Sequence, residues 1–247
     1  EAARVCALRG HDVTLFEKRK LGGYLHEASV PDFKSDIRPL MKNLIHQVEQ
    51  LGIKVIMEEA TQEKIAEMSP DAVILALGAA PVNLRIPGGE KAHTVNALDI
   101  LNDKVKAGKN VVVVGGGLIG TETALYLAEK GHKVTIVEML NEIMADVAVT
   151  DKLAYMEKIA QSELTILTGQ RVTEITENGL TISNAKMEHK EIPADTVIMA
   201  VGLAPVPNII NCEKDAPNYE IYKIGDFVKA GKIFDAIHTG YKTALRI

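Results

Sequence analysis

The stretch Val111-Val-Val-Val-Gly-Gly-Gly-Leu-Ile-Gly-Thr-Glu122 decides the fold of this 247-residue chain. Its four valines predict a strand buried on both faces, and its glycines have the spacing Gly-x-Gly-x-x-Gly. The apolar positions that follow predict a helix ending at Gly131, and a second strand, 134–137, leads to Glu138. Strand, glycine loop, helix, strand and acid in this order predict a dinucleotide-binding βαβ unit.

Each glycine of the loop has a predicted role in binding a pyrophosphate. Gly115 permits the tight turn, Gly117 lets the backbone approach the pyrophosphate, and Gly120 lets helix and strand pack closely. The helix then begins with Leu118 and Ile119, so that its positive end faces the anion. A glycine-rich turn of an ordinary α/β protein is the competing interpretation, but the flanking elements meet every condition of the motif.

Two acidic residues of this unit are candidates for contacts with the nucleotide. Glu138 would accept hydrogen bonds from the adenosine ribose hydroxyls and repel a 2′-phosphate, and residues 139–142 contain no Arg or Lys. The sequence therefore favours NADH over NADPH, although Lys133 lies just upstream. Glu122, one turn into the helix, either reaches toward the nicotinamide or is an exposed helical glutamate.

Part of this unit is repeated at the beginning of the chain. Residues 1–17 (EAARVCALRGHDVTLFE) align with residues 122–138 (ETALYLAEKGHKVTIVE). The second copy is preceded by a strand and a glycine loop, whereas the first copy begins inside the predicted helix. We therefore expect that the first unit lacks its opening strand and its pyrophosphate-binding loop in this chain.

A second repeat shows that the chain contains two copies of one α/β unit. Residues 71–81 (DAVILALGAAP) align with residues 195–205 (DTVIMAVGLAP). In each copy an apolar strand is followed by a glycine, Gly78 or Gly202, and then a proline. The backbone would bend there, where the carboxyl edge of the sheet faces a nucleotide.

The tail, 222–247, has no counterpart in the first copy and predicts a strand, a loop and a helix that complete the first unit. The predicted fold class is therefore α/β, with two Rossmann-like, doubly wound dinucleotide-binding domains, the second inserted in an incomplete first. The predicted domains are 1–88, 89–205 and 206–247, with the linker within 81–91. Periodicity predicts helices over 36–51, 96–106 and 152–161, and strands over 53–57 and within 164–181.

Composition limits the classes of function. A net charge of −5 argues against nucleic-acid binding, and no apolar run is long enough to span a membrane. Cys6 and Cys212 are the only cysteines, which is typical of a cytoplasmic protein, and they form no Cys-x-x-Cys motif. The histidines have no metal-ligand spacing, so we expect no metal site, and His11, His132 and His238 are expected at the surface or at helix ends.

The chain resembles the two-dinucleotide-domain flavoproteins, in which an NAD(P)H domain interrupts an FAD domain. It looks most similar to the C-terminal part of multidomain old yellow enzyme-type reductases, such as 2-enoate reductase and 2,4-dienoyl-CoA reductase. The segments that carry the resemblance are 15–18 (LFEK), 21–23 (LGG), 77–79 (LGA), 111–138, 224–226 (IGD) and 232–237 (KIFDAI).

The resemblance implies an FAD site in the first unit. Glu17 would bind the adenosine ribose of FAD with Lys18 beside it, although Lys18 is equally well explained as a solvated surface charge. Asp226 would accept a hydrogen bond from the ribityl chain, or else it caps the final helix. The remaining residues that the resemblance assigns to FAD are Gly78, Gly225, and the backbone of Ala236 and Ile237.

The resemblance also implies a reaction. NADH would reduce FAD, and electrons would pass through a 4Fe-4S cluster to FMN in an N-terminal barrel, where a C=C bond is reduced. The barrel, the cluster ligands and the FMN site lie outside this sequence. The expected partners are therefore the cofactors and that barrel, and the resemblance is also compatible with a homo-oligomer. No catalytic side chain is assigned, and FAD binding is in doubt because the expected loop is missing.

Other functions stay open at this point. One is a non-catalytic fragment that only binds NADH, and another is part of a different pyridine nucleotide-disulfide reductase-like NADH oxidase or reductase. A complete single-domain NAD dehydrogenase lacks a candidate proton-relay pair, and it leaves the Ile-Gly-Asp tail unexplained.

Overall fold

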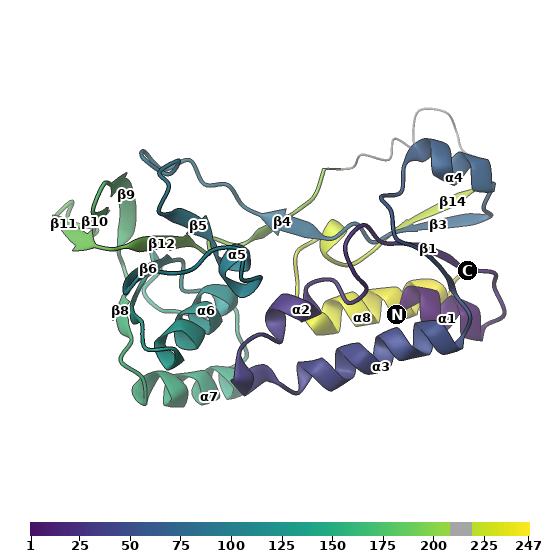
Figure 1. The fold of residues 1–247 in the computed structure, drawn as a ribbon, viewed down its shortest axis with the longest axis horizontal. Coiled ribbons are helices and arrows are strands. Elements are labelled where there is room, and N and C mark those ends of the chain that lie inside the picture. Colours follow the sequence, from purple (N-terminus) through teal and green to yellow (C-terminus); the bar gives the residue numbers. More distant parts are fainter. Residues whose placement is uncertain (208–218) are drawn as a thin grey trace. The chain divides into compact units, whose positions relative to one another are not determined.

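The computed structural model describes residues 1–207 and 219–247, which form two compact units (Figure 1). Unit 1 comprises Glu1–Ala80 and Leu203–Ile247, and unit 2 comprises Pro81–Gly202. Cys212 lies outside the described residues. None of the helices in the described ranges combines the length and the apolar composition that a membrane crossing requires.

Unit 2 is built on a five-stranded parallel sheet with the order β5-β12-β6-β7-β8. The strands are β5 (Thr94–Asn96), β12 (Thr196–Met199), β6 (Asn110–Val114), β7 (Lys133–Val137) and β8 (Thr165–Leu167). The valines of β6 are at most 6% exposed, as expected for a central strand covered on both faces. The sequence-based prediction of a doubly buried strand is confirmed.

Helices and a small antiparallel sheet complete unit 2. The helices are α5 (Ala97–Leu101), α6 (Leu118–Glu129) and α7 (Val149–Ala160), and the small sheet consists of β9 (Arg171–Thr176), β10 (Gly179–Ser183) and β11 (His189–Pro193). One apolar core joins the two sheets: Val112 and Val197 of the parallel sheet pack with Ile175 and Leu180 of the small one. This core holds the carboxyl ends of β6 and β7 in place.

The strands of unit 1 form three separate pairs. The parallel pairs are β1 (Thr14–Phe16) with β2 (Lys54–Ile56), and β3 (Ala72–Leu75) with β14 (Glu220–Lys223). The third pair is β4 (Ala79–Pro81) with β13 (Leu203–Pro205). The helices of this unit are α1 (Ala2–Leu8), α2 (Leu25–Ala28), α3 (Ile37–Gln50), α4 (Gln62–Met68) and α8 (Ile233–Ala244), with single 3₁₀ turns η1 (Asp32–Lys34) and η2 (Gly225–Phe227).

The repeats explain this arrangement of unit 1. By the sequence alignment, β1 is the counterpart of β7 and β3 is the counterpart of β12, and in unit 2 both of those strands pair with β6. Within the described part of unit 1, no strand joins β1 to β3. Instead, α1 and α8 share a small apolar cluster with Val13, directly before β1, and with Ile74 of β3.

Two element boundaries differ from the sequence-based expectations. The helix expected over 96–106 ends at Leu101, because Asp103 adopts a left-handed backbone (φ 57°) and the Lys104 amide turns back to the Asp99 carbonyl. The helix expected from residue 152 already begins at Val149.

The units also divide at different residues than the predicted domains do. Segment 82–88, assigned from sequence to the first domain, belongs to unit 2. Ile86 packs against the core of unit 2, and the Ile175 amide donates to the Pro87 carbonyl over 2.8 Å.

Candidate functional site

The glycine loop of unit 2 shows a separate physical need for each glycine. Gly115 has φ +105°, and a Cβ atom there would lie 2.4 Å from the Ala200 carbonyl oxygen. A Cβ on Gly120 would lie 2.0 Å from the Gly115 carbonyl oxygen, so helix and loop touch directly. Gly117, by contrast, has nothing within 4 Å of that position. Gly115 and Gly120 therefore shape the loop, and Gly117 leaves its surface open.

Glu138 holds this loop in place. Its Oε2 accepts a hydrogen bond from the Gly116 amide (2.7 Å) and its Oε1 accepts one from the Leu140 amide (2.8 Å). Glu138 is only 8% exposed, and its bond to Gly116 is buried, whereas its bond to the exposed Leu140 is partly buried. A carboxylate has about four lone-pair positions, which leaves room for further donors. The sequence predicted a ribose contact for Glu138 and missed its role in bracing the loop.

The segment after Glu138 folds back over the glycine loop. The Met144 amide donates to the Gly116 carbonyl (2.7 Å), and Ile143 is 4% exposed. A Cβ on Gly116 would lie 2.6 Å from the Ile143 side chain, so this glycine is needed as well. Met139 and Leu140, in contrast, are exposed beside Glu138.

Glu122 is buried, which contradicts the alternative that it is an exposed helical glutamate. It is 7% exposed, and its Oε1 accepts a hydrogen bond from the hydroxyl of Tyr155 on α7. Burial, and then the bond to Glu122, raise the pKa of the Tyr155 phenol far above its ordinary value. Tyr155 therefore remains a hydrogen-bond donor over the whole working range of pH. The sequence analysis did not identify Tyr155.

The raised pKa of Tyr155 predicts how stability depends on pH. Above pH ~10 the unfolded chain loses the phenol proton while the folded chain keeps it, so the free energy of unfolding falls with rising pH. Replacement by phenylalanine should make this fall shallower between pH ~9 and ~11, measured by urea unfolding followed by circular dichroism. Equal slopes for the wild type and Tyr155→Phe would contradict the prediction.

The polar residues predicted to bind FAD have protein partners in unit 1. Glu17 Oε1 accepts from the Arg19 amide (2.8 Å), and Lys18 forms an exposed ion pair with Glu59. This favours the interpretation of Lys18 as a solvated charge. Asp226 Oδ1 accepts from the Gly231 amide (2.9 Å), in the turn that leads into α8.

The start of α8 is organised differently from the expectation. Asp235, and not Asp226, caps this helix, since its Oδ2 accepts from the Lys232 amide (2.8 Å). The Ala236 amide donates to the Lys232 carbonyl (3.1 Å) and is used within the helix. Amides without an intrahelical partner occur earlier in a helix, so a ligand at this end would meet residues before Ala236 and Ile237.

The predicted glycines outside the loop have left-handed backbones. Gly78 (φ +78°), Gly202 (φ +105°) and Gly225 (φ +61°) all lie in the region that favours glycine. The two repeat glycines make equivalent bonds, because the Gly78 carbonyl accepts from the Val206 amide and the Gly202 carbonyl from the Val82 amide. The bends expected from the repeat are present in both copies.

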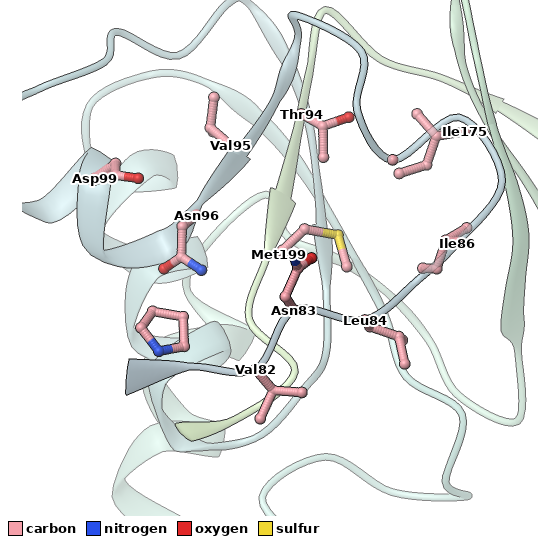
Figure 2. Close-up of a pocket in the computed structure, with 12 residues that line it drawn as sticks. Val82, Asn83, Leu84, Ile86, Thr94, Val95, Asn96, Asp99, Ile175 and Met199 are labelled. Atoms are coloured by element: carbon pink, nitrogen blue, oxygen red, sulfur yellow. The ribbon is translucent and has the colours of Figure 1, made fainter. Parts of the chain in front are cut away.

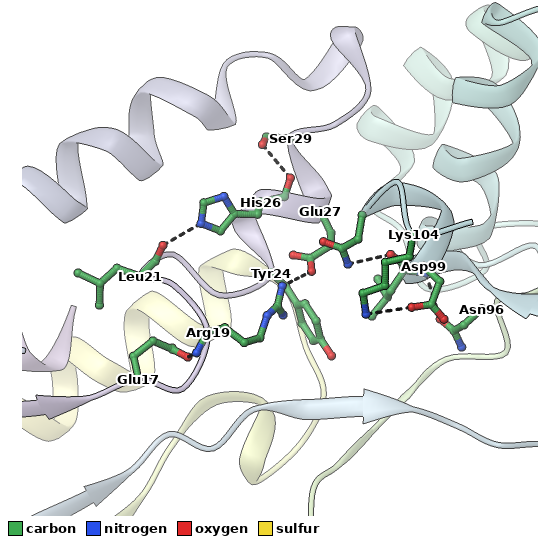
Figure 3. Close-up of polar contacts among 12 residues, drawn as sticks. Glu17, Arg19, Leu21, Tyr24, His26, Glu27, Ser29, Asn96, Asp99 and Lys104 are labelled. Carbon is green, nitrogen blue, oxygen red and sulfur yellow. Dashed lines mark hydrogen bonds and ion pairs between the residues drawn. The ribbon is translucent and has the colours of Figure 1, made fainter. Parts of the chain in front are cut away.

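A polar cluster in unit 1 was not predicted from the sequence (Figure 3). Glu27 is 2% exposed and forms an ion pair with Arg19, whose guanidinium lies 5.7 Å from the centre of the Tyr24 ring. The Tyr24 hydroxyl donates to the Ala79 carbonyl (2.8 Å), and burial raises the pKa of this phenol. Through Tyr24, the cluster connects the segment after β1 with β4 by a hydrogen bond.

A pocket of about 370 Å³ lies elsewhere in unit 2 (Figure 2). Its wall includes Leu84, Ile86 and Met199, with Thr94 and Asn96 as polar members. Asn96 is already used as the cap of α5, where its Oδ1 accepts from the Leu98 amide (3.0 Å). No lining residue belongs to the glycine loop, so we do not identify this pocket with the nucleotide site. The described residues contain no cluster of side chains suited to a metal ion.

Comparison with known proteins finds a matching family and several similar proteins. Residues 1–225 match the family described as pyridine nucleotide-disulphide oxidoreductase. The chain is 40% identical to an NADH oxidase of Thermoanaerobacter brockii and 35% identical to a cinnamate reductase of Clostridium sporogenes, in both cases over its whole length. It covers 39% and 37% of those proteins. A solved 2-naphthoyl-CoA reductase superposes over all of this chain and 38% of its own, with a TM-score of 0.93 and 33% identity.

Proposed function

The chain belongs to the pyridine nucleotide-disulphide oxidoreductase family, and from this premise we propose that it is the NADH-to-FAD electron-transfer part of a flavin-dependent, enoate reductase-type enzyme. The observation that carries the NADH part is the buried Glu138, which braces the glycine loop beside the open surface at Gly117. The carboxylate disfavours a 2′-phosphate, so the proposed nucleotide is NADH rather than NADPH.

The residues of unit 2 fit a dinucleotide. The pyrophosphate would lie against Gly117 and the first turn of α6, at Leu118 and Ile119, and the adenosine ribose beside Glu138. Glu122 would lie toward the nicotinamide. When bound, the nicotinamide and the flavin supply the hydride chemistry. The protein binds and orients them, and no side chain is proposed as an acid or base.

The residues of unit 1 fit only part of an FAD molecule. Glu17 and Asp226 offer carboxylate oxygens; each accepts one backbone amide, which leaves room for further donors. The described part of unit 1 has no counterpart of the Gly115–Gly120 loop. The FAD assignment therefore rests on the family and on the residues shared with it.

The reaction of the whole enzyme is a further part of the proposal. The chain spans about two fifths of the length of its relatives, two of which are named as a cinnamate reductase and a bilirubin reductase. We propose that C=C reduction takes place in a separate barrel that holds FMN and a 4Fe-4S cluster. The proposal places the enzyme in the cytoplasm, where the two cysteines of this chain would stay reduced.

One observation favours a second candidate, an NADH-binding module without flavin turnover. The parallel strands of unit 1 form two separate pairs rather than one sheet. A unit arranged in this way would bind FAD weakly, while unit 2 would still bind NADH.

An anaerobic absorbance titration tests the proposal. FAD is added to the purified chain, unbound flavin is removed, and NADH is then added. We expect flavin bands that bleach with NADH, and Glu138→Ala should need far more NADH to bleach them. A chain that binds NADH but retains no flavin would support the second candidate. A chain that binds neither would contradict both.

A further inference from the structure

Glu122 is a buried carboxylate at the contact between α6 and α7, where charged side chains are uncommon. It lies on α6, one turn after the glycine loop, and is 7% exposed. Burying a carboxylate is costly unless hydrogen-bond donors surround it. The Tyr155 hydroxyl is such a donor, and it comes from α7, a different helix.

The helix that carries Tyr155 has a second polar contact with the rim of the nucleotide site. Lys152, nearly one turn earlier on α7, forms an ion pair with Glu142, in the segment that follows Glu138. The Lys152 contact is on the side where the adenosine would lie, and the Tyr155 contact is at Glu122. Helix α7 therefore contacts the proposed nucleotide site at two positions, Glu142 and Glu122.

We propose that Tyr155 is a positioning residue for the nicotinamide end of the bound dinucleotide: it holds the Glu122 carboxylate where that group accepts a hydrogen bond from the nicotinamide carboxamide. The inference rests on the proposed function, because it requires that unit 2 binds NADH. A carboxylate can accept about four hydrogen bonds, so the Tyr155 bond is compatible with one more donor from the ligand.

The bond is suited to this role for two reasons. A hydrogen bond to a charged group is stronger than one between neutral groups, so it keeps the carboxylate in one orientation. The phenol also keeps its proton, because the pKa of Tyr155 is raised by burial and by Glu122. The hydroxyl therefore donates to Glu122 throughout the pH range in which nucleotide binding is measured.

A purely structural role for Tyr155 makes a different prediction. If the hydroxyl only joined α7 to α6, its loss would disturb the whole site and weaken every ligand alike. A positioning role affects only ligands that carry the nicotinamide. ADP-ribose has the adenosine, the pyrophosphate and both riboses of NADH but no nicotinamide, so it separates the two cases.

The experiment compares NADH and ADP-ribose binding to the chain by isothermal titration calorimetry. Tyr155→Phe should weaken NADH binding about tenfold and change ADP-ribose binding less than about twofold. Tyr126→Phe is a matched variant on α6. The Tyr126 hydroxyl accepts a hydrogen bond from the exposed Lys130, so its loss should change the binding of neither ligand. Lys152→Met, at the adenosine side of α7, should weaken both ligands by similar factors.

A second variant keeps the test valid if Tyr155→Phe folds poorly. Glu122→Gln retains one oxygen that can accept from Tyr155, but the NH2 group that replaces the second carboxylate oxygen cannot accept from the carboxamide. It should weaken NADH selectively, and Tyr155→Phe should then add little in the Glu122→Gln background. Equal weakening of both ligands, or no weakening of NADH, would overturn the inference. Failure of the wild-type chain to bind ADP-ribose would instead overturn the proposed nucleotide site.

Discussion

Gly120→Ala is expected to abolish NADH binding and to lower the free energy of unfolding by on the order of 3 kcal/mol. The new Cβ would lie 2.0 Å from the Gly115 carbonyl oxygen and 3.1 Å from the Ala200 side chain. One neighbour is a backbone atom and the other is a Cβ atom, and neither can turn aside as the end of a long side chain could, so α6 has to move away from the loop. Urea unfolding followed by circular dichroism measures the stability, and NADH fluorescence measures the binding, since the chain has no tryptophan that would interfere.

Gly117→Ala is the matched control for this prediction. Its backbone, with φ −68°, suits alanine, and nothing lies within 4 Å of the new Cβ. The variant should keep the wild-type stability and still bind NADH less tightly, because the methyl group stands where the pyrophosphate approaches. The explanation would be wrong if Gly120→Ala bound NADH normally, or if both variants lost the same stability.

Glu138→Ala is expected to have the second largest effect. It leaves the Gly116 and Leu140 amides without their acceptor, and a buried unsatisfied donor costs about 1–3 kcal/mol. The glycine loop loses the hydrogen bond at Gly116 that holds it in place, and the nucleotide loses the acceptor for its ribose hydroxyls. We expect the affinity for NADH to fall by about tenfold or more, and the preference for NADH over NADPH to fall with it.

Glu138→Gln separates the two roles of this side chain. Its amide oxygen can replace one of the two carboxylate oxygens, so most of the stability should be retained. The negative charge is lost, so the discrimination against NADPH should still decline. Calorimetric titration with both nucleotides measures this. A Glu138→Ala protein with wild-type stability and wild-type nucleotide preference would show that the carboxylate neither braces the loop nor selects the ligand.

The parts of the fold that the sequence predicted correctly are those in which the signal is local. The valine run before Gly115 predicted the central strand β6, and helical spacing predicted α3 and α6. Each of these elements is specified by residues that follow one another along the chain, and the repeats then extended the same argument to β1 and β3.

The misjudged features all depend on contacts between distant segments. The stretch 81–91 looked like a linker because of its prolines and glycines, but Ile86 packs against an apolar core that only the folded sheets create. Glu122 had two interpretations, and the one that placed it at the surface is wrong, because it is buried and bonded to Tyr155, which lies on another helix. No spacing rule along the chain predicts either contact.

The sequence by itself determined that this chain is a duplicated α/β protein with one complete dinucleotide-binding unit, because glycine spacing, strand composition and helix periodicity are properties of short segments. Only the tertiary structure decided which residues surround the proposed nucleotide site of that unit. The bonds of Glu138 to the loop amides and of Tyr155 to Glu122 form when sheet packing brings together residues far apart in the chain, and burial then makes these bonds strong.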